Sequence, residues 1–460
     1  MSKGFQSDGP IKATVVSDAR PLCSSDEPID QDLLDGCLVH LDEQIGRQLD
    51  AILHHPAFQA LESTWRGLDF LIDHTDFRRN VKIETLDVSM EMLRQDFEDA
   101  PDIVQSGLFR LTYIEEYDMP GGEPIAALVS AFEFDHRAPD IALLRNLSKV
   151  AAATHMPFIG AVSPAFFDKT SMEAVAGIRD LASWFDRAEY LKWKSFRDTE
   201  DARYVGLTLP RFLARLPYGP DTAPVYAFNY TENVREAGTS GYLWTSAAFA
   251  FAANLVKSFV RNGWCLQIRG PQAGGLINTL PVLRYELGTG GLARISTEAL
   301  ISETREHEFA DLGLIPLSYT SNHDDPCFFS AHSTQRPRDY DTRHASANSR
   351  INARLPYIFL LSRIAHHLKL IQRENIGTTR DRRLLEIELN TWIRSLVTEM
   401  TAPGEDLQAA HPLREARVIV EDIDDNPGFF RIKLFIVPHF QVEGIDINLS
   451  LASQMPKAKS

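Results

Sequence analysis

The sequence predicts an α+β fold of mixed α/β layers that ends in a helix pair and an antiparallel hairpin. The order strand, helix, strand around Ile125–Ser130, Asp140–Thr154 and Phe158–Val162 is typical of a βαβ unit. In the last third, two amphipathic helices precede runs of β-favouring residues. We expect three parts: an N-terminal arm and linker helix (residues 1–55), an α/β body (residues 56–330) and a C-terminal domain (residues 331–460).

The composition argues against several classes of protein. The net charge of −16, from 47 basic and 63 acidic residues, is unlike that of a nucleic-acid binder, which needs clustered Lys and Arg. No segment reaches the roughly 18 consecutive apolar residues of a membrane span, and the first residues lack the apolar core of a signal peptide. The four cysteines are scattered, which is typical of reduced thiols. We expect a cytoplasmic protein with no cofactor.

The N-terminal part is predicted to be a polar arm followed by a helix. The first 30 residues or so are rich in Ser, Asp, Pro and Gly and contain one β-favouring run, Ile11–Val16. From Ile29 to Leu53, apolar residues recur at steps of three and four, which indicates an amphipathic helix. Asp30 and Asp32 suit the positive end of its dipole.

The stretch that follows, "HHPAFQALESTWRGL", could be a binding site or a joint between the arm and the body, and we expect a joint. His54 and His55 are neighbours and would point about 100° apart on a helix, whereas helical metal ligands lie three or four residues apart. We therefore expect a helix-end or packing role for this pair. Trp65 shares a helical face with Phe58 and Leu61, so we expect it to be a core anchor.

The body contains no complete catalytic motif. The glycine-rich stretches Arg269–Gly275 and Gly288–Gly291 lack the Lys-Ser/Thr of a phosphate loop and the full dinucleotide pattern. "HEF" at His307–Phe309 lacks the second histidine of a zinc-protease helix, and no G-x-S-x-G occurs. We assign no catalytic, metal-binding or cofactor-binding residues.

One metal-binding alternative stays open. His323, Asp324 and Asp325 could bind a metal ion and serve a metal-dependent hydrolase. Consecutive polar residues before a proline are more often a solvated turn. We therefore keep the metal-dependent hydrolase as an alternative function and not as the main one.

The C-terminal domain begins with two predicted helices. The first, from about Asn352 to Glu374, carries basic residues spaced three or four apart, so that they share one face: Arg363, His366, Lys369 and Arg373. The second, Asp381–Met400, is apolar enough to be packed on several sides.

Three strands are predicted to follow these helices, at Ala416–Asp422, Phe429–Phe440 and Gly444–Ser453. The loop Asp424–Gly428 favours a hairpin between the first two. An unpaired edge of this sheet could accept the arm strand of another copy, and such a contact does not close, so it builds a filament. The candidate strand-exchange residues are Ile11, Ala13, Thr14, Val15 and Val16 of the arm and Ile432, Leu434 and Ile436 of the long strand.

Several blocks of the sequence, read in order, resemble one family. They include "ILHHPAFQALESTWRGLDFLI", "GGEPIAALVSAFEF", "VAAATHMPFIGAVSP", "FRDTEDARYVGLTLPRFLARLPYG", "GWCLQIRGPQAGG", "LGLIPLSYTSNHDDPCFFSAHS" and "FRIKLFIVPHFQVEG". From about Asp30 to Pro456 the chain is similar to the large subunit of the contractile sheath of type VI secretion systems, the TssC (VipB, ImpC, EvpB) family.

The resemblance implies a cytoplasmic structural protein with no enzyme activity. It implies pairing with the small sheath subunit TssB/VipA, and stacking of the pairs with other copies around a tube of Hcp rings above a baseplate. Residues 56–330 would then form the sheath body and residues 331–460 a polymerisation domain. The basic face with Arg363, His366, Lys369 and Arg373 is the candidate surface for holding the tube.

The N-terminus departs from the family pattern. Many members carry a longer N-terminal region with a short helix that the disassembly ATPase ClpV recognises, whereas about 30 mostly polar residues precede the first predicted helix here. Recognition by ClpV and a specialised role as a second sheath paralogue are both left open.

Overall fold

The computed structural model describes residues 30–119, 121–234, 241–286, 292–319, 325–375, 382–398, 400, 404–422, 429–439 and 449–456. The chain forms two compact units, one of residues 1–53 with 218–232 and one of residues 54–217 with 233–460. Among the described residues, no helix combines the length and the apolarity that a membrane span requires.

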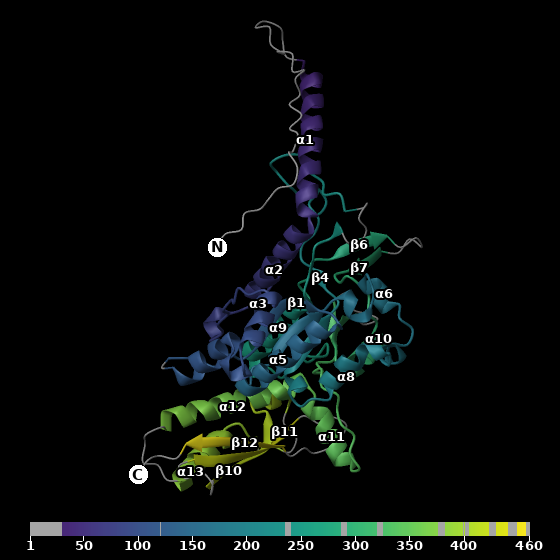
Figure 1. Cartoon of the computed structure of the whole chain (residues 1–460). Coiled ribbons are helices and arrows are strands. Elements are labelled where there is room, and N and C mark those ends of the chain that lie inside the picture. The colour runs from purple at the N-terminus through teal and green to yellow at the C-terminus, as the bar shows by residue number, and fades with distance from the viewer. Residues whose placement is uncertain are drawn as a thin grey trace. The chain divides into compact units, whose positions relative to one another are not determined.

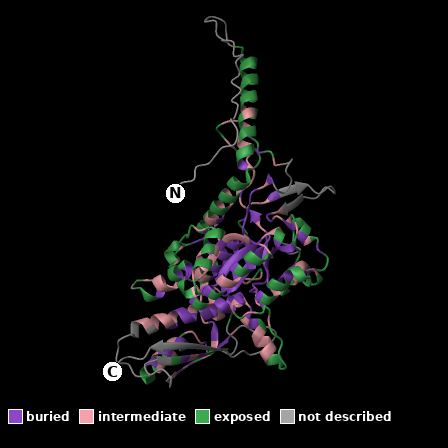
Figure 2. Cartoon of the chain, in the orientation of Figure 1, coloured by how far each residue is buried: buried purple, intermediate pink, exposed green. Residues whose placement is uncertain are grey.

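The described part of the smaller unit contains helix α1 (Gln31–Leu53) and the loop 218–232. The loop is held to the helix where the Tyr230 hydroxyl donates a hydrogen bond to Asp50 at 2.6 Å, and where the Tyr230 ring lies against Gly46. The amphipathic helix predicted from residue 29 is confirmed. Most of its apolar side chains are nevertheless exposed, and most of the helix is drawn in the green of exposed residues in Figure 2. Leu53 is its one buried residue.

The larger unit is built on a five-stranded sheet of order β1-β2-β3-β8-β9. Neighbouring strands in this order are parallel except for β8 and β9, which are antiparallel. Helix α5 (Ala138–Thr154) connects β1 to the parallel β2, so the predicted βαβ unit is confirmed. The strands are β1 (Leu128–Phe134), β2 (Phe158–Val162), β3 (Val205–Leu209), β8 (Ile315–Ser318) and β9 (Cys327–Phe328).

Helices cover both faces of this sheet. Every residue of β2 and β3 is buried, as expected for parallel strands with two covered faces. Phe158 belongs to the apolar cluster that contains the α5 side chains, whereas the next residue, Ile159, belongs to the cluster of helix α9 (Ala247–Asn262). Because successive strand residues point to opposite faces, α5 and α9 cover opposite sides of the sheet.

Shorter elements surround the sheet. The helices are α2 (Pro56–Asp73), α3 (Met90–Asp99), α4 (Gly107–Phe109), α6 (Met172–Ala176), α7 (Leu181–Phe185), α8 (Leu191–Arg197) and α10 (Glu303–Asp311). A π-helix spans Arg110–Asp118, and 3₁₀ turns lie at Phe77–Arg79, Ile103–Gln105, Pro164–Phe167, Ala188–Tyr190 and Asp201–Tyr204. Two-stranded ladders pair β4 (Phe212–Leu213) with β5 (Trp244–Thr245) and β6 (Leu283–Glu286) with β7 (Leu292–Ile295).

The C-terminal region contains the predicted helix pair and hairpin, shown in green and yellow in Figure 1. Its helices are α11 (Arg343–Asn352), α12 (Leu355–Asn375), α13 (Arg382–Arg394) and α14 (Glu405–Ala410). Its antiparallel sheet has the order β10-β11-β12, with β10 at Leu413–Asp422, β11 at Phe429–Pro438 and β12 at Leu449–Pro456. The long strand β11 is therefore central and paired on both sides. The predicted boundary between residues 330 and 331 stays a prediction.

Candidate interaction surfaces

Helix α2 begins at the histidine pair. His55 is its N-cap, and the Nδ1 atom of His55 accepts a hydrogen bond from the Ala57 N–H at 3.3 Å. Pro56 occupies the first helical position, where its missing N–H costs nothing. The predicted helix-end role is thus confirmed for His55. In the described part of the chain, no three His, Cys, Asp or Glu residues form a group that could hold a metal ion.

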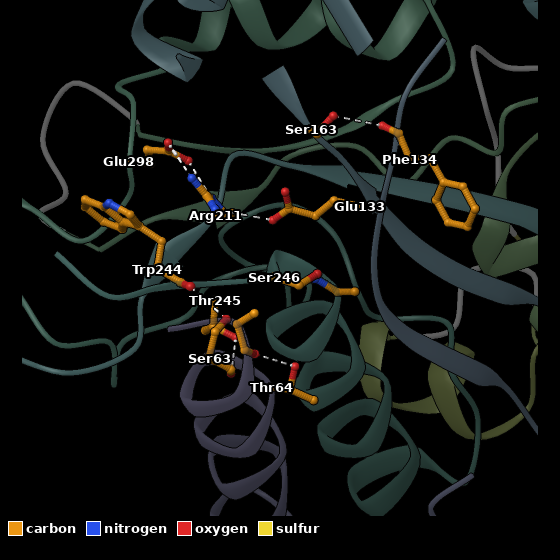
Figure 3. Close-up of polar contacts among 12 residues, drawn as sticks. Ser63, Thr64, Glu133, Phe134, Ser163, Arg211, Trp244, Thr245, Ser246 and Glu298 are labelled. Carbon is orange, nitrogen blue, oxygen red and sulfur yellow. Dashed lines mark hydrogen bonds and ion pairs between the residues drawn. The ribbon is translucent and has the colours of Figure 1, made fainter. Parts of the chain in front are cut away.

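One face of α2 is fixed to the body through small and hydroxyl-bearing residues. A Cβ atom on Gly67 would lie 2.3 Å from the ring of Phe249 in α9, so only glycine allows this close approach. The Ser63 hydroxyl donates to the Trp244 carbonyl, and the Thr245 hydroxyl donates to the Ser63 carbonyl, each at 2.8 Å (Figure 3). These bonds join α2 to strand β5.

The opposite face of α2 carries large apolar side chains that are exposed. Trp65 is 63% exposed and Leu61 is 57% exposed, while Phe58 is just above one third. The prediction that Trp65 is a core anchor is therefore wrong. The reason is that the Gly67 side of the helix, rather than the Trp65 side, packs against α9. Exposed apolar side chains that share one helical face form a candidate surface for binding another molecule.

Helix α1 presents a second apolar surface within its own unit. Its exposed large apolar side chains are Leu33, Leu34, Leu38, Val39, Leu41, Ile45 and Ile52. Most recur at steps of three and four and so share one side of the helix. We refer to these residues as the α1 stripe, and to Phe58, Leu61 and Trp65 as the α2 stripe.

The polar cluster near the end of β1 is a structural link. Arg211 donates two hydrogen bonds to Glu298, both at 2.8 Å, and lies 3.6 Å from a carboxylate oxygen of Glu133 (Figure 3). Burial raises the pKa of Glu133, and the positive charge of Arg211 opposes that effect. The cluster joins three segments that are far apart in sequence, so no local motif could have predicted it.

The predicted basic surface of α12 packs inward. The Arg363 guanidinium lies 4.7 Å from the ring centroid of Phe259 and 5.7 Å from that of Trp264. Burial lowers the pKa of Arg363. Arg373 donates to the Gly122 carbonyl at 3.3 Å. These contacts lie within the larger unit, and they occupy side chains that the sequence analysis gave as the candidate surface for holding the tube.

The other two basic residues cap helix α5. His366 Nε2 donates to the Thr154 carbonyl at 3.2 Å, and Lys369 Nζ donates to the Ala153 carbonyl at 3.3 Å. The Tyr117 hydroxyl also donates to Thr154, at 2.9 Å. The last carbonyls of a helix have no intrahelical partner and carry partial negative charge, so these donors satisfy them. Burial lowers the pKa of His366 to about 4 and that of Lys369 to about 8.

The four α12 residues do share one face, and that face contacts the body. A role in binding a tube would require these side chains to give up the contacts described above. Such a role stays a prediction.

The strand-exchange candidates are divided between described and undescribed residues. Ile432, Leu434 and Ile436 are buried on β11. They pair with β10 on one side and with β12 on the other, so the backbone of β11 has no free edge. The arm residues Ile11–Val16 lie outside the described residues, as do His323 and Asp324 of the alternative metal site.

Comparisons with known proteins match the chain to tail sheath proteins. Residues 35–335 match the EvpB tail sheath N-terminal domain, and residues 344–455 match the EvpB tail sheath gpW/gp25-like domain. The chain is 40% identical over 430 residues to the type VI secretion system sheath protein TssC1 of Pseudomonas aeruginosa, covering 93% of this chain and 86% of that protein.

Two solved structures of sheath-related proteins also match the chain, with low TM-scores. The sheath tail protein of Desulfitobacterium hafniense has a TM-score of 0.33 and 12% identity, with 70% of this chain and 56% of that chain covered. The contracted helical sheath of the anti-feeding prophage has a TM-score of 0.28 and 10% identity, with coverage of 70% and 65%.

Proposed function

Because the chain belongs to the EvpB family of tail sheath proteins, we propose that it is the large structural subunit of a type VI secretion contractile sheath. The observation that carries the proposal is the 40% identity to TssC1 over 93% of the chain. The role is mechanical, and the protein catalyses no reaction. It acts in the cytoplasm, where it polymerises around an Hcp tube above a baseplate.

The exposed apolar stripes support pairing with another subunit. Each Leu-sized side chain that becomes fully buried on association contributes about 1.5–3 kcal/mol, before the cost of ordering both partners is subtracted. The α1 stripe and the α2 stripe are surfaces of this kind. We assign them to the small sheath subunit TssB/VipA, with which the chain forms the heterodimer that stacks into the sheath.

Strand exchange would link one heterodimer to the next. The run Ile11–Val16 of one copy adds to the C-terminal sheet of another copy by backbone pairing. Because β11 is already paired on both sides, the accepting strand is an outer strand of that sheet. Contraction then changes the packing of subunit faces while the added strands keep neighbouring subunits connected.

Electron microscopy of the chain coexpressed with a small sheath subunit tests the proposal. We expect hollow helical sheaths, and tube-filled sheaths when Hcp is added. A well-behaved monomer whose mass in light scattering is unchanged by the small subunit would contradict it. A metal-dependent hydrolase, the alternative considered above, would instead retain a stoichiometric metal ion. Disassembly of the sheaths is then compared with and without ClpV. Disassembly that requires ClpV would show that the ATPase recycles this chain, and resistance to ClpV would favour a specialised paralogue.

A further inference from the structure

Helix α13 covers the outer edge of strand β10 with polar side chains. The Asn390 side chain accepts a hydrogen bond from the Val418 N–H at 3.0 Å and donates one to the Val418 carbonyl at 2.8 Å. Its second amide hydrogen is donated to the Glu386 carbonyl, also at 2.8 Å. One side-chain amide thus bonds both backbone groups of Val418, as a residue on a neighbouring strand would.

The same arrangement continues along the edge. The Val420 carbonyl accepts a hydrogen bond from Arg382 at 3.2 Å, and the Val420 N–H lies 3.5 Å from a carboxylate oxygen of Glu386. Four residues of helix advance about 6 Å, and two residues of strand advance about 6.6–6.8 Å. A row of helix side chains four apart therefore matches the outward-facing groups of a strand two apart.

The segment after α13 forms backbone hydrogen bonds with the first residue of β10, on the same outer edge. The Leu413 N–H donates to the Leu396 carbonyl at 3.2 Å, and the Thr398 N–H donates to the Leu413 carbonyl at 3.1 Å. The outward groups of Leu413, Val418 and Val420 are therefore all bonded within the chain.

Apolar packing sets the position of α13 on the sheet, and a separate row of polar side chains bonds the edge of β10. Leu385, Leu389 and Ile393 are buried in the cluster that contains Val418 and Val420. This row is enough to attach α13 to the face of the sheet. The adjacent row of Arg382, Glu386 and Asn390 lies over the edge instead (Figure 1 shows α13 beside β10).

We propose that Arg382, Glu386 and Asn390 form an edge guard that prevents a second copy of this chain from pairing with β10. Two identical exposed edges can pair around a two-fold axis, which gives a closed dimer that cannot extend into a filament. With the outer edge of β10 bonded at Leu413, Val418 and Val420, strand addition is directed to the other outer strand, β12, which pairs only with β11 among the described residues. The guard is a property of this sheet and does not depend on the proposed function.

The test removes the guard and follows the amide of Val418. In the full-length double variant Glu386→Ala, Asn390→Ala, we expect the Val418 N–H to exchange with deuterium at least about tenfold faster in dilute solution. As the protein concentration is raised, protection should return and the mass measured by light scattering should increase towards a dimer. Thr391→Ala is the matched control, because the Thr391 hydroxyl is exposed and bonds only the Ile387 carbonyl of its own helix.

Faster exchange at every concentration, with the same association as the Thr391→Ala control, would show that the row merely stabilises the helix on the sheet and would overturn the proposal. Asn390→Asp is the second variant in case the double variant does not fold. It keeps the acceptor for the Val418 N–H and places a negative charge against the Val418 carbonyl. It should therefore show a smaller loss of protection and the same dependence on concentration, and the absence of that dependence would also overturn the guard.

Discussion

At the scale of single residues, Gly67 shows how one missing side chain positions a helix. Two hydroxyl-bearing residues of the same helix, Ser63 and Thr64, show which side of α2 contacts the body. Ser63 bonds the carbonyl of Trp244, whereas the Thr64 hydroxyl bonds only the Ala60 carbonyl of its own helix (Figure 3). The close contact of Gly67 with Phe249 therefore decides which side of α2 faces the body.

We expect Gly67→Ala to destabilise the protein despite the higher helix propensity of alanine. The added Cβ would lie 2.3 Å from the Phe249 ring, and overpacking of this kind typically costs about 1–3 kcal/mol. The change is measured as a lower midpoint of urea unfolding. Thr64→Ala on the same helix should shift the free energy of unfolding by less than about 0.5 kcal/mol. Equal midpoints for the two variants would contradict the packing described here.

His366 should make stability depend on pH. Its pKa is lowered by burial from 6.5 to about 4, so between these values the unfolded state binds more protons than the folded state. The free energy of unfolding therefore rises with pH through this window. The contribution of His366 to stability is lost as the pH falls from about 6.5 towards 4. One such group contributes a slope of at most about 1.4 kcal/mol per pH unit.

The measurement compares unfolding midpoints of wild type and His366→Gln between pH 4 and pH 7. Carboxylates titrate in the same range, so the informative quantity is the difference in slope between the two proteins. We expect a shallower slope in the variant, because glutamine can still donate to Thr154 but cannot be protonated. Parallel curves would show that His366 is not buried as a neutral donor.

At the scale of elements, the sequence predicted which segments are helices more reliably than which face of each helix is buried. The periodicity of α2 placed Phe58, Leu61 and Trp65 together correctly, but a surface for a partner has the same apolar pattern as a core surface. The clearer signal was Gly67, a small residue inside the helix where another helix could approach closely.

Charge was ambiguous for a similar reason. Basic residues spaced three or four apart on α12 fit a solvated face, and they fit equally well a row of donors for the carbonyl end of another helix. Only the fold brings Thr154 of α5 next to His366, across more than two hundred residues of sequence. The Arg211 cluster and the bonds from Asn390 to β10 depend on tertiary contacts in the same way.

Replacing Trp65 tests whether the α2 stripe binds the partner subunit. We expect Trp65→Ser to leave the free energy of unfolding within about 0.5 kcal/mol of wild type, because the side chain is 63% exposed. Binding of the small subunit, measured by titration calorimetry, should weaken at least tenfold if the indole is an anchor of the interface. Thr64→Ala, an exposed position about 100° around α2 from Trp65, is the control and should bind normally. Unchanged affinity for Trp65→Ser would remove the α2 stripe from the interface.

At the scale of the whole molecule, the proposed function assigns pairing and polymerisation to different parts of the chain. The apolar stripes would hold the two subunits of a heterodimer together, while strand addition to the C-terminal sheet would join heterodimers into a sheath. The central position of β11 and the covered edge of β10 leave few ways to extend that sheet. We therefore expect that polymerisation can be abolished without loss of the heterodimer.

Deleting residues 1–20 should separate these two steps. We expect the truncated chain to fold and to bind the small subunit with unchanged affinity, while no sheaths are visible by electron microscopy. A point variant distinguishes a donated strand from a simple requirement for length. Val15→Pro removes a backbone donor and fixes φ at about −65°, both of which disfavour a paired strand, whereas Val15→Thr keeps both the donor and the β propensity. Sheath formation should thus fail in Val15→Pro and persist in Val15→Thr. If the deletion and Val15→Pro both assemble normal sheaths, the heterodimers are linked by some other contact and the arm donates no strand.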